Sequence, residues 1–328
     1  MKFGLVYHSS LGHAAPRDES LQDLLTKAKM ASRLGFSSFW VGGGPMRKGW
    51  HPVPTLARAA AEAPGLEFGT LALLSMQQPI EFAEQLASLD AICGGKFTLV
   101  AAQGWRDSQL KAFGLSPKDR LGRFLETLEV MKALWTQEKV TYHGKHFQLD
   151  DVPGTAPCGR KPHLKVLIAA EADRAVRRIP SIGEGWMVSA RYTLPTIARQ
   201  AALYREVCDA AGVKPHISVW RECFVAPTRE EALAAGRKWA ANPFAERIRL
   251  GQGGNPSDPD SVDKPFDALM KDRFIFGSPD DVAAEIARYR SAGADDMVLR
   301  MQVGAMPNDV AFASMRLFSE KVLPRVGT

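Results

Sequence analysis

The stretch LDAICGGKFTLVAAQGW, residues 89–105, contains the junction between a helix and a buried strand. A helical apolar pattern over 80–92 ends at Gly94-Gly95, and the mostly apolar run 96–102 follows before the polar and aromatic cluster Gln103-Gly104-Trp105. Glycine just after a helical pattern is a common helix stop, and a short apolar run bounded by turn residues is typical of a buried strand. The stretch therefore predicts a helix, a tight turn and a strand that ends on polar residues.

The same unit of helix and strand recurs along the whole chain. Apolar runs predict strands over 3–7, 37–41, 66–74, 96–102, 164–170, 185–190, 217–226 and 296–304. Helical spacing predicts helices over 21–35, 55–63, 80–92, 123–135, 173–182, 195–212, 280–293 and 309–326. Alternation of this kind implies a parallel sheet with right-handed crossovers, and eight units most naturally close into a (β/α)8 TIM barrel.

An open doubly wound sheet is the alternative architecture. That fold would be expected to carry a glycine-rich GxGxxG fingerprint after its first strand, and HSSLGHAAP, residues 8–16, has none. We therefore expect one barrel domain over residues 1–328. Two long connections interrupt it, 136–163 after the fourth helix and 243–272 before the last strand–helix unit, and loops of this length are usually functional lids or disordered excursions.

Composition narrows the class of protein. The chain is 45% hydrophobic and 24% charged, and its net charge of +6 is spread along the sequence among acidic residues, which argues against nucleic-acid binding. The four cysteines are far apart and show no metal-ligand or disulfide spacing. There is no apolar run of 18 residues and no signal-peptide layout, so we expect a cytoplasmic protein without a membrane segment.

Several motifs occur in an order that resembles one family. They are LGFSSFWV (34–41), FGTLALLSMQQPIEFAEQLASLDAICGGKFTLVAAQGW (68–105), FGLSPKDRLGRFLETLEVMKALW (113–135), YHGKHFQL (142–149), IAAEADRAVRRIPSIGEGWMVSA (168–190) and FIFGSPDDVAAEIARYRSAGADDMVLRMQVG (274–304). Each is weak alone, but together the chain resembles the bacterial luciferase-like family of flavin-dependent oxidoreductases over nearly its full length. The resemblance implies a TIM barrel that binds reduced FMN or the deazaflavin F420 at its carboxyl-terminal mouth.

The resemblance also implies where the cofactor phosphate binds. A phosphate needs backbone N–H donors and positive charge, and the start of the helix after the fifth strand offers both. Glu171 matches the family pattern there, while Ala172 replaces a hydroxyl residue, so Arg174, Arg177 or Arg178 would have to compensate.

Two further segments are expected to contact the flavin ring. Thr70, Leu71 and Ala72 match the part of strand three where some family members have a non-proline cis peptide, with Leu71–Ala72 as the expected bond. Gln103 stands where a relative carries a phosphate-contacting arginine, so Arg106 is expected to serve instead, and Trp105 could form a wall of the site.

The family's catalytic histidines have no counterpart here. Gly42, Gly43 and Gly44 stand in their place after strand two, and His51 is expected to flank the next helix. His8, at the end of strand one, is the preferred proton-transfer residue. Glu222 is a second catalytic candidate, because it shares one face of its strand with Trp220 and an acid inside a barrel needs a partner.

These features favour a two-component monooxygenase that receives FMNH2 from a separate flavin reductase and oxidises a small organic substrate. F420-dependent hydride transfer and a flavin-binding member without turnover are the alternatives; a sugar-phosphate aldolase or isomerase is less favoured, because no lysine ends a mid-barrel strand. The segment 243–272 is the expected lid, and a homodimer is expected through helices two and three. The candidate lid cations are Arg247, Arg249, Lys264 and Lys271, and the candidate pocket residues are Trp50, Trp105, Trp186, Trp220 and Met301.

Overall fold

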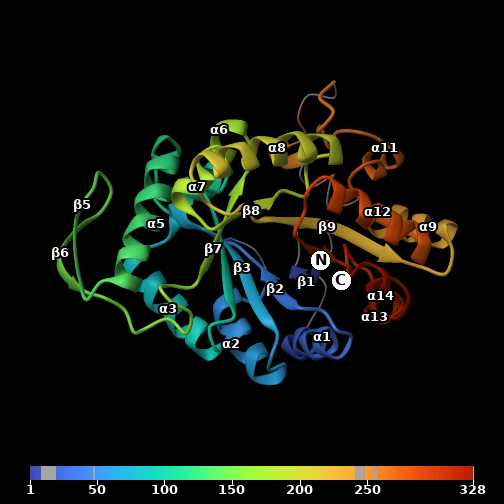
Figure 1. Cartoon of the computed structure of the whole chain (residues 1–328), viewed down its shortest axis with the longest axis horizontal. Helices are drawn as coiled ribbons and strands as arrows, with labels where there is room; N and C mark the ends of the chain where they lie inside the picture. Colours follow the sequence, from blue (N-terminus) through green and yellow to red (C-terminus); the bar gives the residue numbers. More distant parts are fainter. Residues whose placement is uncertain are drawn as a thin grey trace.

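A closed parallel barrel forms the centre of the computed structural model (Figure 1). The structure describes residues 1–8, 20–46, 49–240, 245, 248–252, 254 and 257–327, without the side chains of residues 8, 250 and 252. The barrel strands are β1 (Lys2–His8), β2 (Ser38–Gly42), β3 (Glu67–Leu73), β4 (Phe97–Ala102), β7 (Lys165–Ala170), β8 (Gly185–Val188), β9 (Ile217–Val225) and β11 (Asp296–Arg300). Pairing of Trp186 with Ile217 joins β8 to β9 and closes the ring, so the predicted TIM barrel and all eight strands are confirmed.

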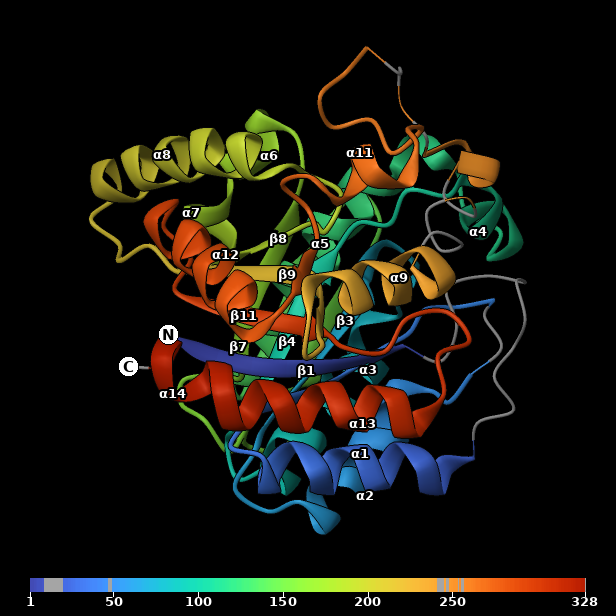
Figure 2. The same ribbon diagram turned by 90° about the vertical axis from the view of Figure 1, so that its right-hand side faces the viewer.

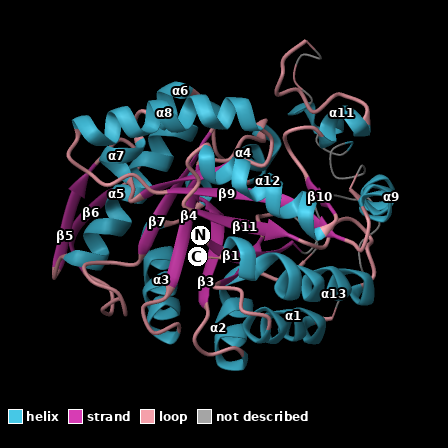
Figure 3. Ribbon diagram, turned by 45° about the vertical axis from the view of Figure 1, so that its right-hand side comes forward, coloured by secondary structure: helices cyan, strands magenta, loops and turns pink. Residues whose placement is uncertain are grey.

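Helices cover the outside of the barrel, as Figures 2 and 3 show from two further sides. The longer ones are α1 (Leu21–Arg33), α2 (Pro52–Glu62), α3 (Pro79–Ile92), α5 (Arg120–Thr136), α8 (Leu194–Ala210), α9 (Arg229–Trp239), α12 (Pro279–Ser291) and α13 (Asn308–Leu317). The shorter ones are η1 (Leu74–Met76), α4 (Asp107–Ala112), η2 (Pro117–Asp119), α6 (Asp173–Val176), α7 (Ile179–Ile182), η3 (Ile248–Gln252), α11 (Phe266–Met270), η4 (Phe318–Val322) and α14 (Leu323–Val326). The last helices contact the first strand–helix unit of the chain. Ser319 Oγ on η4 donates to Leu34 O, at the end of α1, at 2.7 Å.

The helix predicted over 173–182 is two short helices, α6 and α7. Pro180 lies in the first turn of α7, and a proline there has no amide to continue the hydrogen-bond ladder of a preceding helix. The fifth strand is therefore followed by a helix of one turn, with a smaller dipole than a ten-residue helix would have.

The first long connection is an antiparallel hairpin rather than a lid or a disordered loop. Strands β5 (Lys139–His143) and β6 (Gln148–Pro153) pair with each other, and Figure 3 shows them at the edge of the molecule. The Glu126 carboxylate on α5 accepts hydrogen bonds from the amides of Lys145, His146 and Phe147, which anchors the hairpin turn. A further strand, β10 (Ile275–Gly277), pairs with the last three residues of β9.

Side chains alternate between the barrel interior and the layer beneath the helices. The interior is filled by a buried cluster of Val6, Trp40, Val100, Leu167, Met187, Ala190, Trp220 and Val298. Neighbouring residues on the same strands, such as Phe39, Leu99 and Val219, pack outward against the helices. This period of two follows from strand geometry and places every second residue of each strand on the inner wall.

Two other sequence observations can be placed in the fold. All four cysteines are free and buried, and burial raises the pKa of Cys93 to about 12. Within the described ranges, no helix combines the length and apolar character that a membrane crossing requires.

Candidate active site

The inner wall at the carboxyl-terminal mouth is apolar on the side of β3 and β7, and its side chains there are partly exposed. Leu71 and Ala169 pack on the interior cluster but are only half-buried, and Leu73 continues the inward face of β3. Below them, Val100 and Leu167 close the barrel. The mouth therefore has an apolar floor of half-buried side chains, of the kind that suits a flat, hydrophobic ring system.

A buried ion pair stands on the opposite part of the wall. Glu222 on β9 and Arg300 on β11 are register partners, with Glu222 Oε1 3.3 Å from Arg300 Nη1. Both side chains are at most 5% exposed, and the Arg300 guanidinium carbon lies 5.8 Å from the ring centroid of Trp220. The buried Glu222 thus has the charged partner that we expected for it. Arg300 itself was not predicted, although an arginine in the apolar strand DMVLR was a usable signal.

The end of β1 reaches the same mouth. His8 pairs with Gly42 in the β1–β2 register, so its backbone lies at the carboxyl end of the barrel. Its side chain lies outside the described residues, and its role stays a prediction.

Strand β3 presents only one of its three predicted contact residues to the interior. The Thr70 hydroxyl donates to Val41 O at 2.7 Å, and Ala72 packs in the outer core, so both side chains point away from the mouth. Leu71 points inward. The Leu71–Ala72 peptide is trans, against our expectation; the cis bond in the described chain is Lys161–Pro162.

The loop after β4 is exposed at the rim. Gln103 accepts a hydrogen bond on its backbone carbonyl from Ser75 Oγ, and Gly104 turns the chain with a φ of 73°. Trp105 is 36% exposed and lies beneath the Arg106 guanidinium, 5.0 Å from the ring centroid. The exposed Trp105 ring and the Arg106 guanidinium thus form one stacked pair at the rim, and their contact with a cofactor stays a prediction.

The loop after β7 is fixed from behind by helix α8. Asp173 accepts two hydrogen bonds from Arg199 and one from Gln200 Nε2, and these bonds, led by that from Arg199, lower the pKa of Asp173 to about 2. Glu171 is half-buried, and its carbonyl accepts from Tyr192 and Gln200. The start of α6 is therefore a rigid edge of the mouth.

The residues predicted to bind a phosphate, on and after α6, differ in their surroundings, and their role stays a prediction. Ala172 and Arg174 are exposed, and Arg177 lies 3.9 Å from Glu206 on α8. The arginine that does lie beside Glu171 is Arg191, from the loop after β8, with Nη1 3.8 Å from Glu171 Oε2. Arg191 was not predicted, because the loops after β7 and β8 come together only when these strands pair in the folded sheet.

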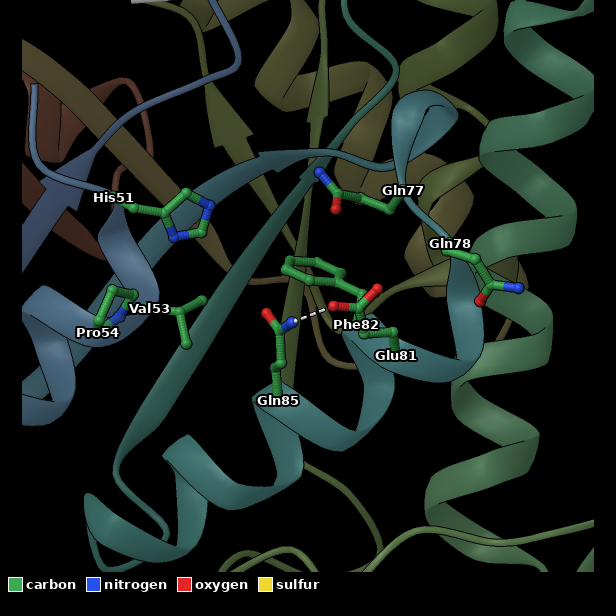
Figure 4. Close-up of a pocket in the computed structure, with 8 residues that line it drawn as sticks. All are labelled: His51, Val53, Pro54, Gln77, Gln78, Glu81, Phe82 and Gln85. Carbon is green, nitrogen blue, oxygen red and sulfur yellow. Dashed lines mark hydrogen bonds between the residues drawn. The ribbon is translucent and has the colours of Figure 1, made fainter. Parts of the chain in front are cut away.

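The glycine segment after β2 packs against helix α2. A methyl group on Gly43 would lie 2.7 Å from Pro52 Cγ, so close packing of the helix start requires this glycine. His51 is the N-cap residue of α2, as expected, and faces a groove of about 460 Å³ between α2 and α3. Figure 4 shows Val53 and Pro54 on one side of this groove and Phe82 and Gln85 on the other.

The remaining candidates are scattered. Trp220 is the only one of the five pocket candidates in the interior cluster; Trp186 and Met301 are in the outer core, and Trp50 is exposed. Of the lid cations, Arg247 lies outside the described residues, Arg249 and Lys271 are exposed, and Lys264 Nζ donates to the carbonyls of Asp258 and Pro259.

Comparisons with known proteins agree with this architecture. A family model described as luciferase-like monooxygenase matches residues 1–296. The F420-dependent glucose-6-phosphate dehydrogenase of Beutenbergia cavernae is 26% identical over 98% of this chain and 97% of that protein. The FMNH(2)-dependent dimethylsulfone monooxygenase of Pseudomonas putida is 24% identical over 66% of this chain and 64% of that protein. Among solved structures, the monooxygenase RslO1 from Streptomyces bottropensis has a TM-score of 0.84, at 26% identity and 99% coverage of both chains.

Proposed function

The chain belongs to the luciferase-like monooxygenase family and is an oxidoreductase, and from this premise we propose a two-component monooxygenase that uses FMNH2 and O2. One oxygen atom of O2 enters a small organic substrate, the other leaves as water, and FMNH2 is oxidised to FMN. The observation that carries the proposal is the half-buried apolar floor of Leu71, Leu73 and Ala169 at the barrel mouth.

The residues at the mouth suit an FMN-sized ligand. The apolar floor fits the ring, and Arg191 beside the loop after β7 supplies a cation for the phosphate. Trp105 and Arg106 stand at the rim on the β4 side. When bound, reduced flavin supplies the electrons for oxygen chemistry; the protein's residues orient it and exclude water.

The proposed proton-handling residues lie on the inner wall. Glu222 is held by Arg300, and its Oε2 atom makes no hydrogen bond to any residue of the described ranges. This buried oxygen can accept a hydrogen bond from a substrate or from His8, the last residue of β1 at the same mouth. We assign His8 to proton transfer and Glu222 to its support.

F420-dependent hydride transfer is the second candidate. The dehydrogenase of Beutenbergia cavernae aligns over nearly all of both chains, whereas the FMNH(2)-dependent relative aligns over about two thirds. The net charge of +6 also suits an acidic cofactor tail. Glycines stand after β2 where the family has its catalytic histidines. This substitution favours a third candidate, a flavin-binding protein without turnover.

Partners and assembly follow from the proposed chemistry. A monooxygenase that receives FMNH2 needs a flavin reductase, because the sequence has no nicotinamide fingerprint. We propose a cytoplasmic homodimer with α2 and α3 at the interface, supported by their small residues and by the groove between them.

The cofactor is tested by anaerobic titration of the purified protein with FMNH2 and with reduced F420. We expect saturable FMNH2 binding, and then oxygen uptake when a panel of organic substrates is added. Binding of F420 alone would replace the monooxygenase with the dehydrogenase, and FMNH2 binding without any substrate-dependent oxygenation would favour the protein without turnover.

A further inference from the structure

Two arginines beneath the mouth are buried without an acidic partner. Arg221 on β9 is 0% exposed and Arg273, just before β10, is 1% exposed. Across the described ranges, neither forms an ion pair with a carboxylate. Moving a guanidinium out of water is costly unless hydrogen bonds and a counter-charge compensate, so these two positions call for an explanation.

Their hydrogen bonds converge on the loop that follows β8. Arg221 donates to Ser189 O at 3.3 Å and to Tyr192 O at 2.6 Å. Arg273 Nε donates to Arg191 O at 2.8 Å. Three carbonyls of the four-residue loop 189–192 are therefore held from below by two rigid, planar donors, which suit this task better than lysine would.

Arg273 also holds part of the segment 243–272, the expected lid. Arg273 Nη2 donates to Pro259 O at 3.0 Å and to Ser261 O at 3.2 Å. Between these residues, Asp260 accepts from the Thr193 amide, the Thr193 hydroxyl and the Thr196 hydroxyl at the start of α8. Hydrogen bonds through Arg273 and Asp260 thus connect the segment 258–261 to the loop 189–192 and to the start of α8.

The loop carries one cation toward the mouth, Arg191. Its side chain is 20% exposed and lies 3.8 Å from Glu171. Its buried Nε atom makes no hydrogen bond within the described chain. The unit therefore holds three guanidinium groups, from Arg191, Arg221 and Arg273, and three carboxylates, from Glu171, Asp258 and Asp260, and Arg191 is the partly exposed member among the three arginines.

We propose that Arg221 and Arg273 are positioning residues that fix Arg191 at the mouth, where its guanidinium binds the phosphate of the bound cofactor. The inference rests on the proposed function, since it assumes a phosphate-bearing flavin or deazaflavin. It adds the residues that hold the anion site in place, and it links the segment 258–261 to cofactor binding.

The experiment compares two ligands that differ only in the phosphate. Reduced FMN and reduced riboflavin are titrated anaerobically against the wild type, Arg273→Met, Arg273→Lys and Arg221→Met. We expect the wild type to prefer FMN, and the Met variants to lose at least tenfold in affinity for FMN but less than twofold for riboflavin. Arg273→Lys keeps the charge and should lie between.

Arg205→Met is the matched control. Arg205 also donates to a backbone carbonyl, Gly293 O at 2.7 Å, but this contact lies just before β11, at the opposite end of the barrel. We expect this control to leave the preference for FMN over riboflavin unchanged. If the Arg221 or Arg273 variants do not fold, Arg191→Met, whose side chain is partly exposed, tests the same preference.

The outcomes separate the inference from the proposed function. Equal losses for FMN and riboflavin in the variants, or a wild type without preference for FMN, would overturn the inference while leaving a flavin enzyme intact. A wild type that binds only F420 would overturn the FMN proposal. The comparison is then repeated with F420 and its phosphate-free chromophore, and an unchanged preference in the variants again refutes the inference.

Discussion

Arg300 Nη1 lies 3.3 Å from Glu222 Oε1 across neighbouring strands, and the pair is enclosed in the wall of the barrel. Glu222→Met is expected to lower the free energy of unfolding by about 3 kcal/mol, because it leaves the Arg300 charge buried without its carboxylate. The double variant Glu222→Met/Arg300→Met should recover most of this loss in urea unfolding. An equal loss in the single and double variants would show that the ion pair does not set stability.

The same two variants separate stability from activity. Because Glu222 is proposed to support proton transfer, the double variant should stay inactive even where its stability is restored. Recovery of turnover together with stability would remove Glu222 from the chemistry.

His8→Asn is expected to lower kcat by about 100-fold, the usual scale of a lost general acid or base, with less than a twofold change in cofactor affinity. The pH profile of kcat should also lose the limb that His8 produces. His51→Asn, in the groove between α2 and α3, is the control and should retain wild-type kcat. A similar kcat in both variants would exclude His8.

Gly104→Ala is expected to destabilise the rim loop. The residue has a φ of 73°, and an added methyl group would lie 3.2 Å from Met76 Cε, so about 1 kcal/mol of unfolding free energy should be lost together with cofactor affinity. Gly114→Ala is the matched control, with a φ of 71° and open space around the added methyl group. It should show the stability loss alone; a loss of cofactor affinity in both variants would refute a specific role for the rim.

Asp296, at the amino-terminal end of the barrel, should make stability depend on pH. Burial is the largest single effect and raises the pKa of Asp296, but the hydrogen bonds from His216, at 3.0 Å, and from Ser218, together with the charges of His216 and Lys165, outweigh it, so the pKa is lower than in the unfolded chain. This contribution is complete above about pH 4, where the unfolded carboxyl is ionised, and is lost as the pH falls through the lower folded pKa.

The measurement is the unfolding free energy of wild type and Asp296→Asn from pH 7 to pH 2. The variant should be less stable at pH 7, and the difference should shrink below about pH 4. Asp150→Asn, at an exposed position on the hairpin, should stay within about 0.5 kcal/mol of wild type throughout. A difference that is constant with pH would contradict the proposed linkage.

The barrel strands could be read from the sequence because their signal is local. Each is a short apolar run bounded by a helix stop or turn residues, and these boundaries hold within a few residues for all eight. Helices α4, α9 and α11 and strand β10 were missed, and the hairpin of β5 and β6 was read as a loop. In the hairpin a period-two pattern is interrupted by exposed polar residues, and its turn is anchored by hydrogen bonds to Glu126 on a distant helix.

The sequence alone determined the order of strands and helices, and with it the barrel and the end at which its polar strand tips collect, because alternating apolar periods leave few ways to bury every helix and strand. Only the tertiary structure decided which side chains face the site. Thr70 and Ala72 turn outward because strand pleating alternates sides. Arg191 meets Glu171 between the loops that follow β8 and β7, and Arg300 on β11 meets Glu222 on β9. Such ion pairs depend on the register between neighbouring strands and on which charges the closed barrel buries together. A local sequence pattern contains neither kind of information.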